Sequence, residues 1–306
     1  MLPSNTNYMA ETSQEFTPLF TPLFTKHSRS WSENRYVYPV ISRRSKGLSV
    51  GVNLNPDKIC NFDCVYCCVD RTTMPQREQG QADVDLEVLR NELDHMLDLV
   101  ASGELWQQPP FDQTPPALRR LNDVAFSGDG EPTSFLRFEE VCRLSHALLS
   151  QKNLDAKLVV ITNATLFHQP RVKLALSYLD TVPSELWAKL DAGTSAYYQR
   201  VERTKVPYER VLLNLLEAAR VRPIVVQSLF MKLEDVEPES AEIDEYVDRL
   251  RTLVAEGGKV KLVQIYTVAR GPAESFVSPL SRQRVDAITE KVRAAGLYAL
   301  PFYGPE

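Results

Sequence analysis

The sequence predicts an α/β fold built on a parallel β-sheet. After Gly47, short apolar runs rich in β-branched residues alternate with amphipathic stretches of helical periodicity. The apolar runs are mostly continuous, which is typical of strands that are covered on both faces. Repeated strand–helix units imply parallel strands joined by right-handed crossovers. Six such units form either an open doubly wound sheet or a partial barrel, and periodicity alone leaves both open.

Each expected element has its own signal. The strand pattern occurs in six runs: Leu48–Leu54, Val124–Ser127, Leu158–Thr162, Leu186–Leu190, Ile224–Phe230 and Val260–Thr267. Apolar stripes of helical spacing cover residues 86–100, 211–219, 243–254 and 285–295. Asp85 and Ser281 precede two of these stripes and are good N-caps. Pro207 suits the first turn of the second helix, and Gly296 marks the C-terminal stop of the last.

The length of 306 residues fits one large α/β domain or two small ones, and 43% hydrophobic residues can supply a sizeable core. We expect one domain over residues 36–306. Residues 1–35 are rich in Thr, Ser, Pro and Asn, and they repeat Thr-Pro-Leu-Phe at Thr17 and Thr21. This composition predicts a mobile, disordered N-terminal extension, either with a docking segment or without a function.

Composition also indicates in which compartment the protein works and which partners it binds. No apolar run reaches the ~18–20 residues that a membrane span needs, and the N-terminus lacks the pattern of a secretion signal. With reduced cysteines, this favours the cytoplasm and no membrane partner. The net charge of −5 counts against nucleic-acid binding by overall charge, but it leaves room for a local site on an RNA.

The most informative motif is a group of closely spaced cysteines. Cys60, Cys64 and Cys67 form a C-x3-C-x2-C pattern just after the first expected strand. Thiolates this close indicate a metal site or an iron–sulfur site. A cubane 4Fe–4S cluster has four irons, so three cysteines leave one iron without a protein ligand. That iron can bind a small molecule, and the spacing therefore points to chemistry as well as to structure.

Other uses of the cysteines fit less well. A structural zinc site usually needs a second cysteine or histidine pair, but only Cys68 and Cys142 remain and the four histidines are scattered. Five sparse cysteines do not make a disulfide framework. A simple electron carrier would want a fourth cysteine ligand. We expect Cys68, adjacent to Cys67, not to be a ligand, and Cys142 to lie in the core.

Tyr66, directly before the last cysteine of the motif, completes a resemblance. The loop resembles the cluster loop of the radical S-adenosylmethionine (SAM) superfamily, which has an aromatic residue at this place. The resemblance implies that Cys60, Cys64 and Cys67 hold a 4Fe–4S cluster and that Tyr66 packs near the adenine of SAM. It also implies a partial (β/α)6 TIM-like barrel with its site at the C-terminal ends of the strands.

Unusual polar residues do follow the expected strands. Residues 127–133 read Ser-Gly-Asp-Gly-Glu-Pro-Thr, and the two glycines permit close approach to a ligand and positive φ. A tight turn into a helix would explain this segment equally well. It resembles the Gly-Gly-Glu-Pro segment of the superfamily, with Asp129 in place of the middle glycine. The resemblance implies that Gly128, Asp129, Gly130 and Glu131 bind the amino group of SAM.

Later strand ends carry further candidates. Asn163 could bind a ribose or cap a turn. Lys189 and Asp191 lie on the same side of their strand by alternation, either as a buried ion pair or as ligand-binding groups. The resemblance implies that Lys189 lies near the SAM carboxylate and Asp191 near the ribose hydroxyls. Gln227 and Gln264 are either core amides or parts of a polar barrel interior, and Gln227 is a further candidate for binding SAM.

Two basic segments complete the set. Ser42-Arg43-Arg44-Ser45 reads as a solvated turn, and Arg270 could hold an anionic substrate. The order Pro-x-x-Ser-Arg-Arg, Gly-Leu-Ser-Val-Gly-Val-Asn and cysteine loop resembles small bacterial members of the branch grouped with wyosine-base synthases, which act on transfer RNA. This resemblance runs from about Tyr36 to the C-terminus. The wyosine enzymes themselves carry extra cysteines for a second cluster and a pyruvate-binding lysine, and this sequence has no second cysteine set.

The resemblance implies a radical SAM enzyme. Its reduced cluster would cleave SAM to a 5′-deoxyadenosyl radical, which abstracts hydrogen from an unknown substrate: a tRNA, a peptide or a small molecule. A reductant such as flavodoxin or ferredoxin would supply the electron. The alternatives are a tRNA-modifying enzyme of the wyosine-synthase type, a non-catalytic iron–sulfur redox or sensor protein, and an RNA-binding scaffold on a degenerate barrel.

Overall fold

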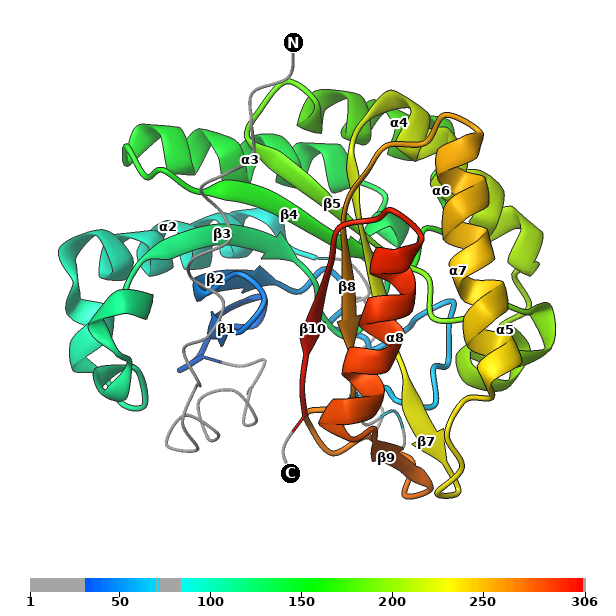
Figure 1. Ribbon diagram of the computed structural model, residues 1–306. Helices are drawn as coiled ribbons and strands as arrows, with labels where there is room; N and C mark the ends of the chain where they lie inside the picture. The colour runs from blue at the N-terminus through cyan, green and yellow to red at the C-terminus, as the bar shows by residue number, and fades with distance from the viewer. Residues whose placement is uncertain (1–30, 70, 72–83, 305–306) are drawn as a thin grey trace, which may run out of the picture.

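The chain folds into a curled sheet with helices on its outer face (Figure 1). The computed structural model describes residues 31–69, 71 and 84–304. Over these residues the main sheet has eight strands: β1 (Val37–Ser42), β2 (Gly47–Val52), β3 (Leu121–Phe126), β4 (Lys157–Thr162), β5 (Ser184–Lys189), β6 (Ile224–Leu229), β8 (Val260–Tyr266) and β10 (Ala299–Phe302). The strands lie side by side in this order across the sheet. The sheet curls into a half-barrel, which confirms the predicted partial barrel.

All neighbouring strands of the main sheet are parallel except β1 and β2, which form an antiparallel pair. A small antiparallel pair, β7 (Met231–Leu233) with β9 (Val277–Pro279), lies apart from it. The predicted extension over residues 1–35 lies outside the described residues except for its last five. Of these, Trp31 packs its ring against Phe111, with 5.3 Å between the ring centroids.

The α-helices are α2 (Leu86–Ser102), α3 (Phe138–Gln151), α4 (Pro170–Leu179), α5 (Ser195–Glu202), α6 (Tyr208–Val221), α7 (Ser240–Ala255) and α8 (Arg282–Ala294). Short 3-10 helices are η2 (Glu104–Gln107), η3 (Phe111–Gln113), η4 (Pro116–Leu118) and η5 (Pro132–Ser134). The Asp85 carboxylate accepts hydrogen bonds from two backbone N–H groups of α2, and the Ser281 hydroxyl accepts one from α8, so both predicted caps are confirmed. No helix in the described part of the chain is both long and apolar enough to span a membrane.

The sequence patterns missed both edge strands of the sheet and half of β3. Pro39 lies within β1 and Pro301 within β10, and a proline argues against a strand unless the strand lies at an edge, where its missing N–H has no partner to lose. β3 begins at Leu121 rather than Val124 because Asn122 and Asp123, which read as loop residues, belong to the strand.

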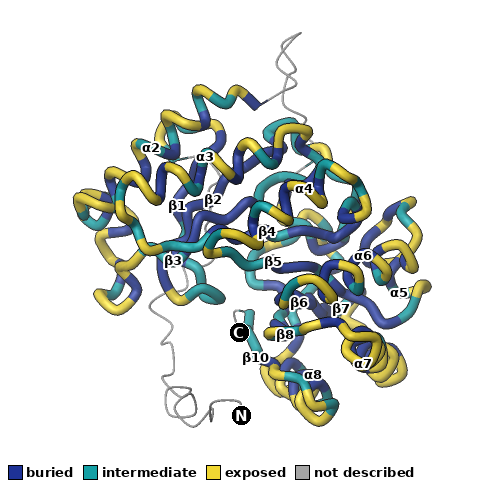
Figure 2. The backbone as a smooth tube through the Cα atoms, turned by 90° about the horizontal axis from the view of Figure 1, so that it is seen from above, coloured by how far each residue is buried: buried dark blue, intermediate teal, exposed yellow. Residues whose placement is uncertain are grey.

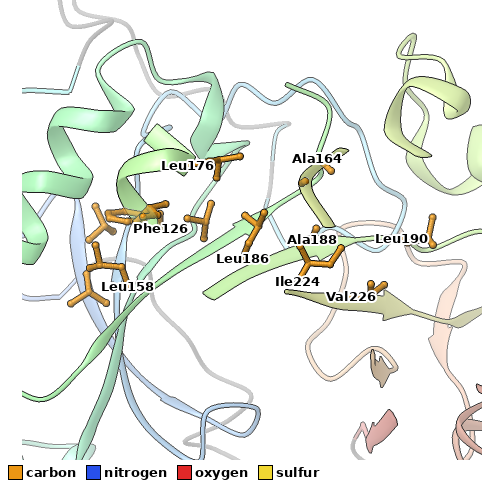
Figure 3. Close-up of a cluster of buried hydrophobic side chains, with 14 of the residues drawn as sticks. Phe126, Leu158, Ala164, Leu176, Leu186, Ala188, Leu190, Ile224 and Val226 are labelled. Atoms are coloured by element: carbon orange, nitrogen blue, oxygen red, sulfur yellow. The ribbon is translucent and has the colours of Figure 1, made fainter. Parts of the chain in front are cut away.

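Alternation along the strands separates two environments. Figure 2 shows the largely buried strands inside an arc of helices whose outward faces are exposed. On the outer face of the sheet, Phe126, Leu158, Leu186 and Ile224 pack in the main core beneath the helices (Figure 3). On the inner face, a separate small cluster faces the interior of the half-barrel: Ala125, Val159, Trp187 and Val225. Functional side chains must therefore share the alternation of this second set.

Candidate functional site

A cavity of about 320 Å³ opens on the inner face of the half-barrel. All predicted site residues except Asp191 line it: Cys60, Cys64, Tyr66, Cys67, Gly128, Asp129, Gly130, Glu131, Asn163, Lys189 and Gln227. They come from the cysteine loop after β2 and from the C-terminal ends of β3 to β6. A second cavity, of about 500 Å³, lies at the opposite end of the sheet between α4 and α6 and contains none of them.

The cysteine loop is anchored on helix α5. The backbone N–H of Val65 donates to the carbonyl of Val201 over 2.9 Å. The hydroxyl of Thr204, just after the helix, donates to the carbonyl of Asn61 over 2.7 Å. These contacts join parts of the chain that are far apart in sequence, and they fix the loop against the strand ends.

Glu202, the last residue of α5, faces the cysteines and was not predicted. The Cys64 thiol donates a hydrogen bond to its carboxylate, with 2.7 Å between Sγ and Oε2. Burial and then Glu202 raise the pKa of Cys64 well above its ordinary value, so the thiol keeps its proton here. Burial and then Asp191 raise the pKa of Glu202 to about 8. No local sequence signal marks Glu202, because only folding brings α5 to the loop.

Arg71 joins the cysteine loop to the glycine-containing segment after β3. One guanidinium nitrogen donates to the Cys67 sulfur over 3.1 Å, another to the backbone carbonyl of Asp129 over 3.0 Å, and the third to that of Lys58 over 3.1 Å. Sequence analysis missed this residue too. A guanidinium with three fixed donors holds these segments in one arrangement.

Gly128 and Gly130 are required by close packing. A Cβ atom at Gly130 would lie 2.2 Å from the carbonyl oxygen of Ile59, and one at Gly128 would lie 2.2 Å from the side-chain oxygen of Asn53. Neither glycine has positive φ, so that part of the prediction is wrong. The close approach is to the chain between β2 and Cys60, which explains why glycine is needed without any strained turn.

Asp129 and Asn53 make a reciprocal pair. The Asn53 amide donates to the Asp129 carboxylate over 2.7 Å, and the Asp129 backbone N–H donates to the Asn53 side-chain oxygen over 3.1 Å. The Asp129 carboxylate is therefore held by Asn53, the residue that directly follows β2.

The Glu131 carboxylate accepts four hydrogen bonds from the protein. It accepts from the backbone N–H and hydroxyl of Thr133, from the Thr162 hydroxyl over 2.6 Å and from the Asn163 N–H over 2.7 Å. Burial raises its pKa, although these donors oppose the shift. Three of these donors bind Oε1 and one, the Asn163 N–H, binds Oε2, so the side chain ties the end of β3 to the end of β4 while Oε2 can accept a further hydrogen bond.

Asn163 uses its side chain within the protein. Its oxygen accepts from the N–H and hydroxyl of Thr165, which is the predicted capping alternative. Its amide donates to Asn61 of the cysteine loop over 2.7 Å. Asn163 therefore also aligns the end of β4 with that loop.

Lys189, Asp191 and Tyr66 form one buried group. The predicted same-side placement is confirmed: the Lys189 nitrogen lies 3.4 Å from the Asp191 carboxylate. The Tyr66 hydroxyl donates to Asp191 and accepts from Lys189. Asp191 also accepts from the N–H of Leu229 over 2.7 Å. Burial lowers the pKa of Lys189, but nearby anions led by Asp191 outweigh it, so the net pKa is raised and the lysine stays charged.

Gln227 pairs with Gln264 across β6 and β8, with 2.7 Å between amide nitrogen and oxygen. The side-chain oxygen of Gln227 is buried and has no hydrogen-bond partner among the residues that the structure describes. Since it lines the cavity, it is an acceptor available to a ligand. The predicted polar interior is present at this point of the barrel.

Asp123 is a buried carboxyl group on the inner face that sequence analysis did not single out. Its Oδ1 accepts from the Ser49 hydroxyl, and hydrogen bonds from Ser49 and Ser45 partly oppose the effect of burial on its pKa. Burial raises the pKa of Asp123, so ionisation costs the folded state more than the unfolded state. The free energy of unfolding should therefore fall as pH rises above about 4, the ordinary pKa of aspartate.

Replacing Asp123 by asparagine should remove this part of the pH dependence. Relative to wild type, Asp123→Asn should gain stability with rising pH, by about 1.4 kcal/mol for each unit by which folding raises the pKa. Urea denaturation of both proteins between about pH 3 and about pH 8 measures the difference in the free energy of unfolding. This range begins below the ordinary pKa of aspartate. A difference that stays constant over this range would show that Asp123 does not titrate in the folded protein with a raised pKa.

Among the residues that the structure describes, no three His, Cys, Asp or Glu side chains converge as ligands of a single metal ion. Cys60, Cys64 and Cys67 nevertheless line one cavity. In a cubane cluster each thiolate binds a different iron, so three cysteines around a cavity do not need to meet at one point.

No family model matches the chain. Its sequence is similar to a UPF0026 protein of Helicobacter pylori, with 27% identity over 180 residues that cover 58% of this chain and 48% of that protein. It is also similar to a UPF0026 protein of Methanocaldococcus jannaschii, with 27% identity over 160 residues that cover 50% and 42% of the two chains. The chain thus spans about half the length of these curated relatives.

Solved structures share the architecture. A radical SAM methyltransferase from Sphaerobacter thermophilus matches with a TM-score of 0.59 and 13% identity, over 87% of this chain and 69% of that one. Streptococcus suis SuiB bound to S-adenosylmethionine matches with a TM-score of 0.51 and 11% identity, over 86% and 49%. Identities this low establish the fold alone. With its curled eight-stranded sheet over the described residues, this chain has the radical SAM fold.

Proposed function

We propose that this chain is a radical SAM enzyme in which Cys60, Cys64 and Cys67 hold a 4Fe–4S cluster. The observation that carries the proposal is that these thiols line the same cavity as the polar groups at the strand ends. A protein that only carried electrons would have no need for this second set of groups. The radical SAM fold supports the same conclusion.

The donor set fits the cluster and its ligand. Thiolates are the protein ligands of iron–sulfur clusters, and three of them leave one iron for the amino and carboxylate groups of SAM. The buried, unpartnered oxygen of Gln227 and the charged Lys189 offer hydrogen bonds and charge to a bound molecule in the same cavity. When bound and reduced, the cluster supplies the electron that cleaves SAM to a 5′-deoxyadenosyl radical.

The protein residues bind and orient the cofactors. In this proposal Lys189 attracts the SAM carboxylate and Tyr66 packs near the adenine. Asp191, buried behind the residues that line the cavity, lies near the ribose and holds Lys189 and Tyr66 in place. The segment from Gly128 to Glu131 offers backbone groups to the amino end of SAM, with Glu131 holding the segment against β4. Asn163 keeps the cysteine loop and β4 in register. The barrel around them excludes water from the reacting groups.

Asp191→Ala should weaken SAM binding by about tenfold or more while iron and sulfide content stays near wild type, because a charge-assisted hydrogen bond is lost without touching the cysteines. The test is equilibrium dialysis of labelled SAM against protein reconstituted anaerobically with iron and sulfide. Asp191→Asn retains an acceptor for Leu229 and serves as the milder variant. Asp180→Ala, which breaks an exposed ion pair with Arg222 at the other end of β5, is the matched control.

Two results would count against the proposal. If reconstituted wild-type protein binds no SAM, the cavity does not have the proposed function. If well-folded Asp191→Asn loses iron and SAM to the same extent, Asp191 is part of a structural ion pair rather than a SAM-binding residue.

A further inference from the structure

Three further arginines line the same cavity as the cysteines. Arg43 and Arg44 lie in the turn between β1 and β2, and Arg270 follows β8. The Arg43 guanidinium donates to the backbone carbonyl of Tyr303, just after β10. Since β1 and β10 are the two edges of the sheet, this contact bridges the open side of the half-barrel and brings the arginines together.

The three guanidinium groups are close enough to repel one another. Burial lowers the pKa of Arg43 to about 10, and the charges of Arg44 and Arg270 contribute to the shift. At neutral pH Arg43 is still charged. Concentrating like charges at a partly buried site is unfavourable unless an anion compensates them.

No carboxylate forms an ion pair with Arg43 or Arg44 within the described part of the chain. Elsewhere arginines are paired, as Arg137 is with Glu140 and Arg222 with Asp180. Among the described residues, therefore, no carboxylate compensates the charges of Arg43 and Arg44.

The acids that line the cavity are engaged with other residues. Asp129 pairs with Asn53, the Glu131 carboxylate accepts from Thr133, Thr162 and Asn163, and Asp123 accepts from Ser49. None of the three lies against Arg43 or Arg44 as an ion-pair partner.

Arg44 is held by aromatic rings instead. Its guanidinium carbon lies 5.1 Å from the centroid of the Tyr266 ring and 5.7 Å from that of Trp187, both on the inner face of the sheet. Ring contacts orient the planar guanidinium without using its N–H donors. These donors suit two oxygens of a carboxylate or a phosphate.

We propose that Arg43 and Arg44 bind an oxyanion group, a phosphate or a carboxylate, of the substrate. This inference rests on the proposed function, since it assigns the ligand to the same cavity, and it extends that function by naming the substrate class. The substrate enters with its anionic group at the bridged edge of the sheet and its remaining part directed along the cavity towards the strand ends.

The test measures anion binding to the full chain by isothermal titration calorimetry at constant ionic strength. Inorganic phosphate and succinate are the two probes, and the one that binds more tightly identifies the oxyanion. Arg44→Gln should weaken binding of that probe by about tenfold or more, because charge-assisted hydrogen bonds are lost. Among the described residues Arg44 makes ring contacts but no ion pair or hydrogen bond, so this variant should fold normally, which circular dichroism checks. Arg137→Gln, at an exposed ion pair on the other side of the sheet, is the control.

The inference is overturned if neither probe binds, if Arg44→Gln binds as wild type does, or if Arg137→Gln loses as much affinity. The assay needs neither iron nor SAM, so its outcome is separate from that of the proposed function. Anion binding that depends on Arg44, in a protein that does not cleave SAM, would support this site and refute the radical chemistry. SAM cleavage by a protein that shows no such anion binding would support the radical chemistry and refute the anion site.

Discussion

Cys64→Ala is expected to abolish loading of a 4Fe–4S cluster and SAM cleavage while the chain stays folded. The cluster would lose one of three protein ligands, and the remaining two leave two irons exposed to solvent or to other ligands. The alanine removes only one donor to Glu202 from the fold. Iron and sulfide analysis after anaerobic reconstitution, with circular dichroism on the same sample, measures both effects.

Cys68→Ala is the matched control for this variant. Cys68 also lines the cavity but is more exposed than the other three loop cysteines, and it is expected not to be a ligand. The control should load iron and sulfide as wild type does. If Cys68→Ala loses the cluster as Cys64→Ala does, four cysteines hold it, and a redox carrier becomes the better account. A Cys64→Ala protein that loads the full cluster would contradict the assignment of its ligands.

Gly130→Ala should destabilise the protein by about 1–3 kcal/mol and reduce cluster loading, because it overfills a packed contact. Its methyl group would meet the Ile59 carbonyl oxygen at 2.2 Å, and a backbone atom cannot swing aside as a side chain can. The segment after β3 would have to move away from the loop that leads into Cys60. Thermal or urea denaturation together with iron analysis tests both consequences.

Gly271→Ala provides the comparison, because a Cβ atom there meets no other atom within 4 Å. Its stability should stay within about 0.5 kcal/mol of wild type. If Gly130→Ala is as stable as Gly271→Ala and loads the cluster fully, the contact between the two loops is looser than the structure indicates.

Local patterns were enough to predict the central sheet, because the six interior strands carry continuous apolar runs. The edge strands β1 and β10 were missed because a proline interrupts each run, and only their edge positions make this tolerable. The start of β3 was missed because Asp123 looks like a loop residue until Ser49 of the neighbouring strand is placed beside it.

Some residues of the candidate site could likewise be predicted from the sequence, and others could not. The spacing of Cys60, Cys64 and Cys67 and the alternation that brings Lys189 beside Asp191 could be read from neighbouring residues. Glu202 and Arg71 could not, because their significance depends on contacts made only after folding. The glycines were recognised, but their reason was only partly understood: close approach between two loops requires them, whereas positive φ does not.

The most direct test of the central claim is the fate of SAM. Protein reconstituted anaerobically with iron and sulfide is mixed with dithionite and SAM, and 5′-deoxyadenosine is measured by mass spectrometry, with Cys64→Ala as the negative control. We predict that wild type forms 5′-deoxyadenosine and the variant does not. Folded wild-type protein that takes up no cluster, or a loaded and reduced protein that leaves SAM intact, would contradict the proposal that this half-barrel is a radical SAM enzyme.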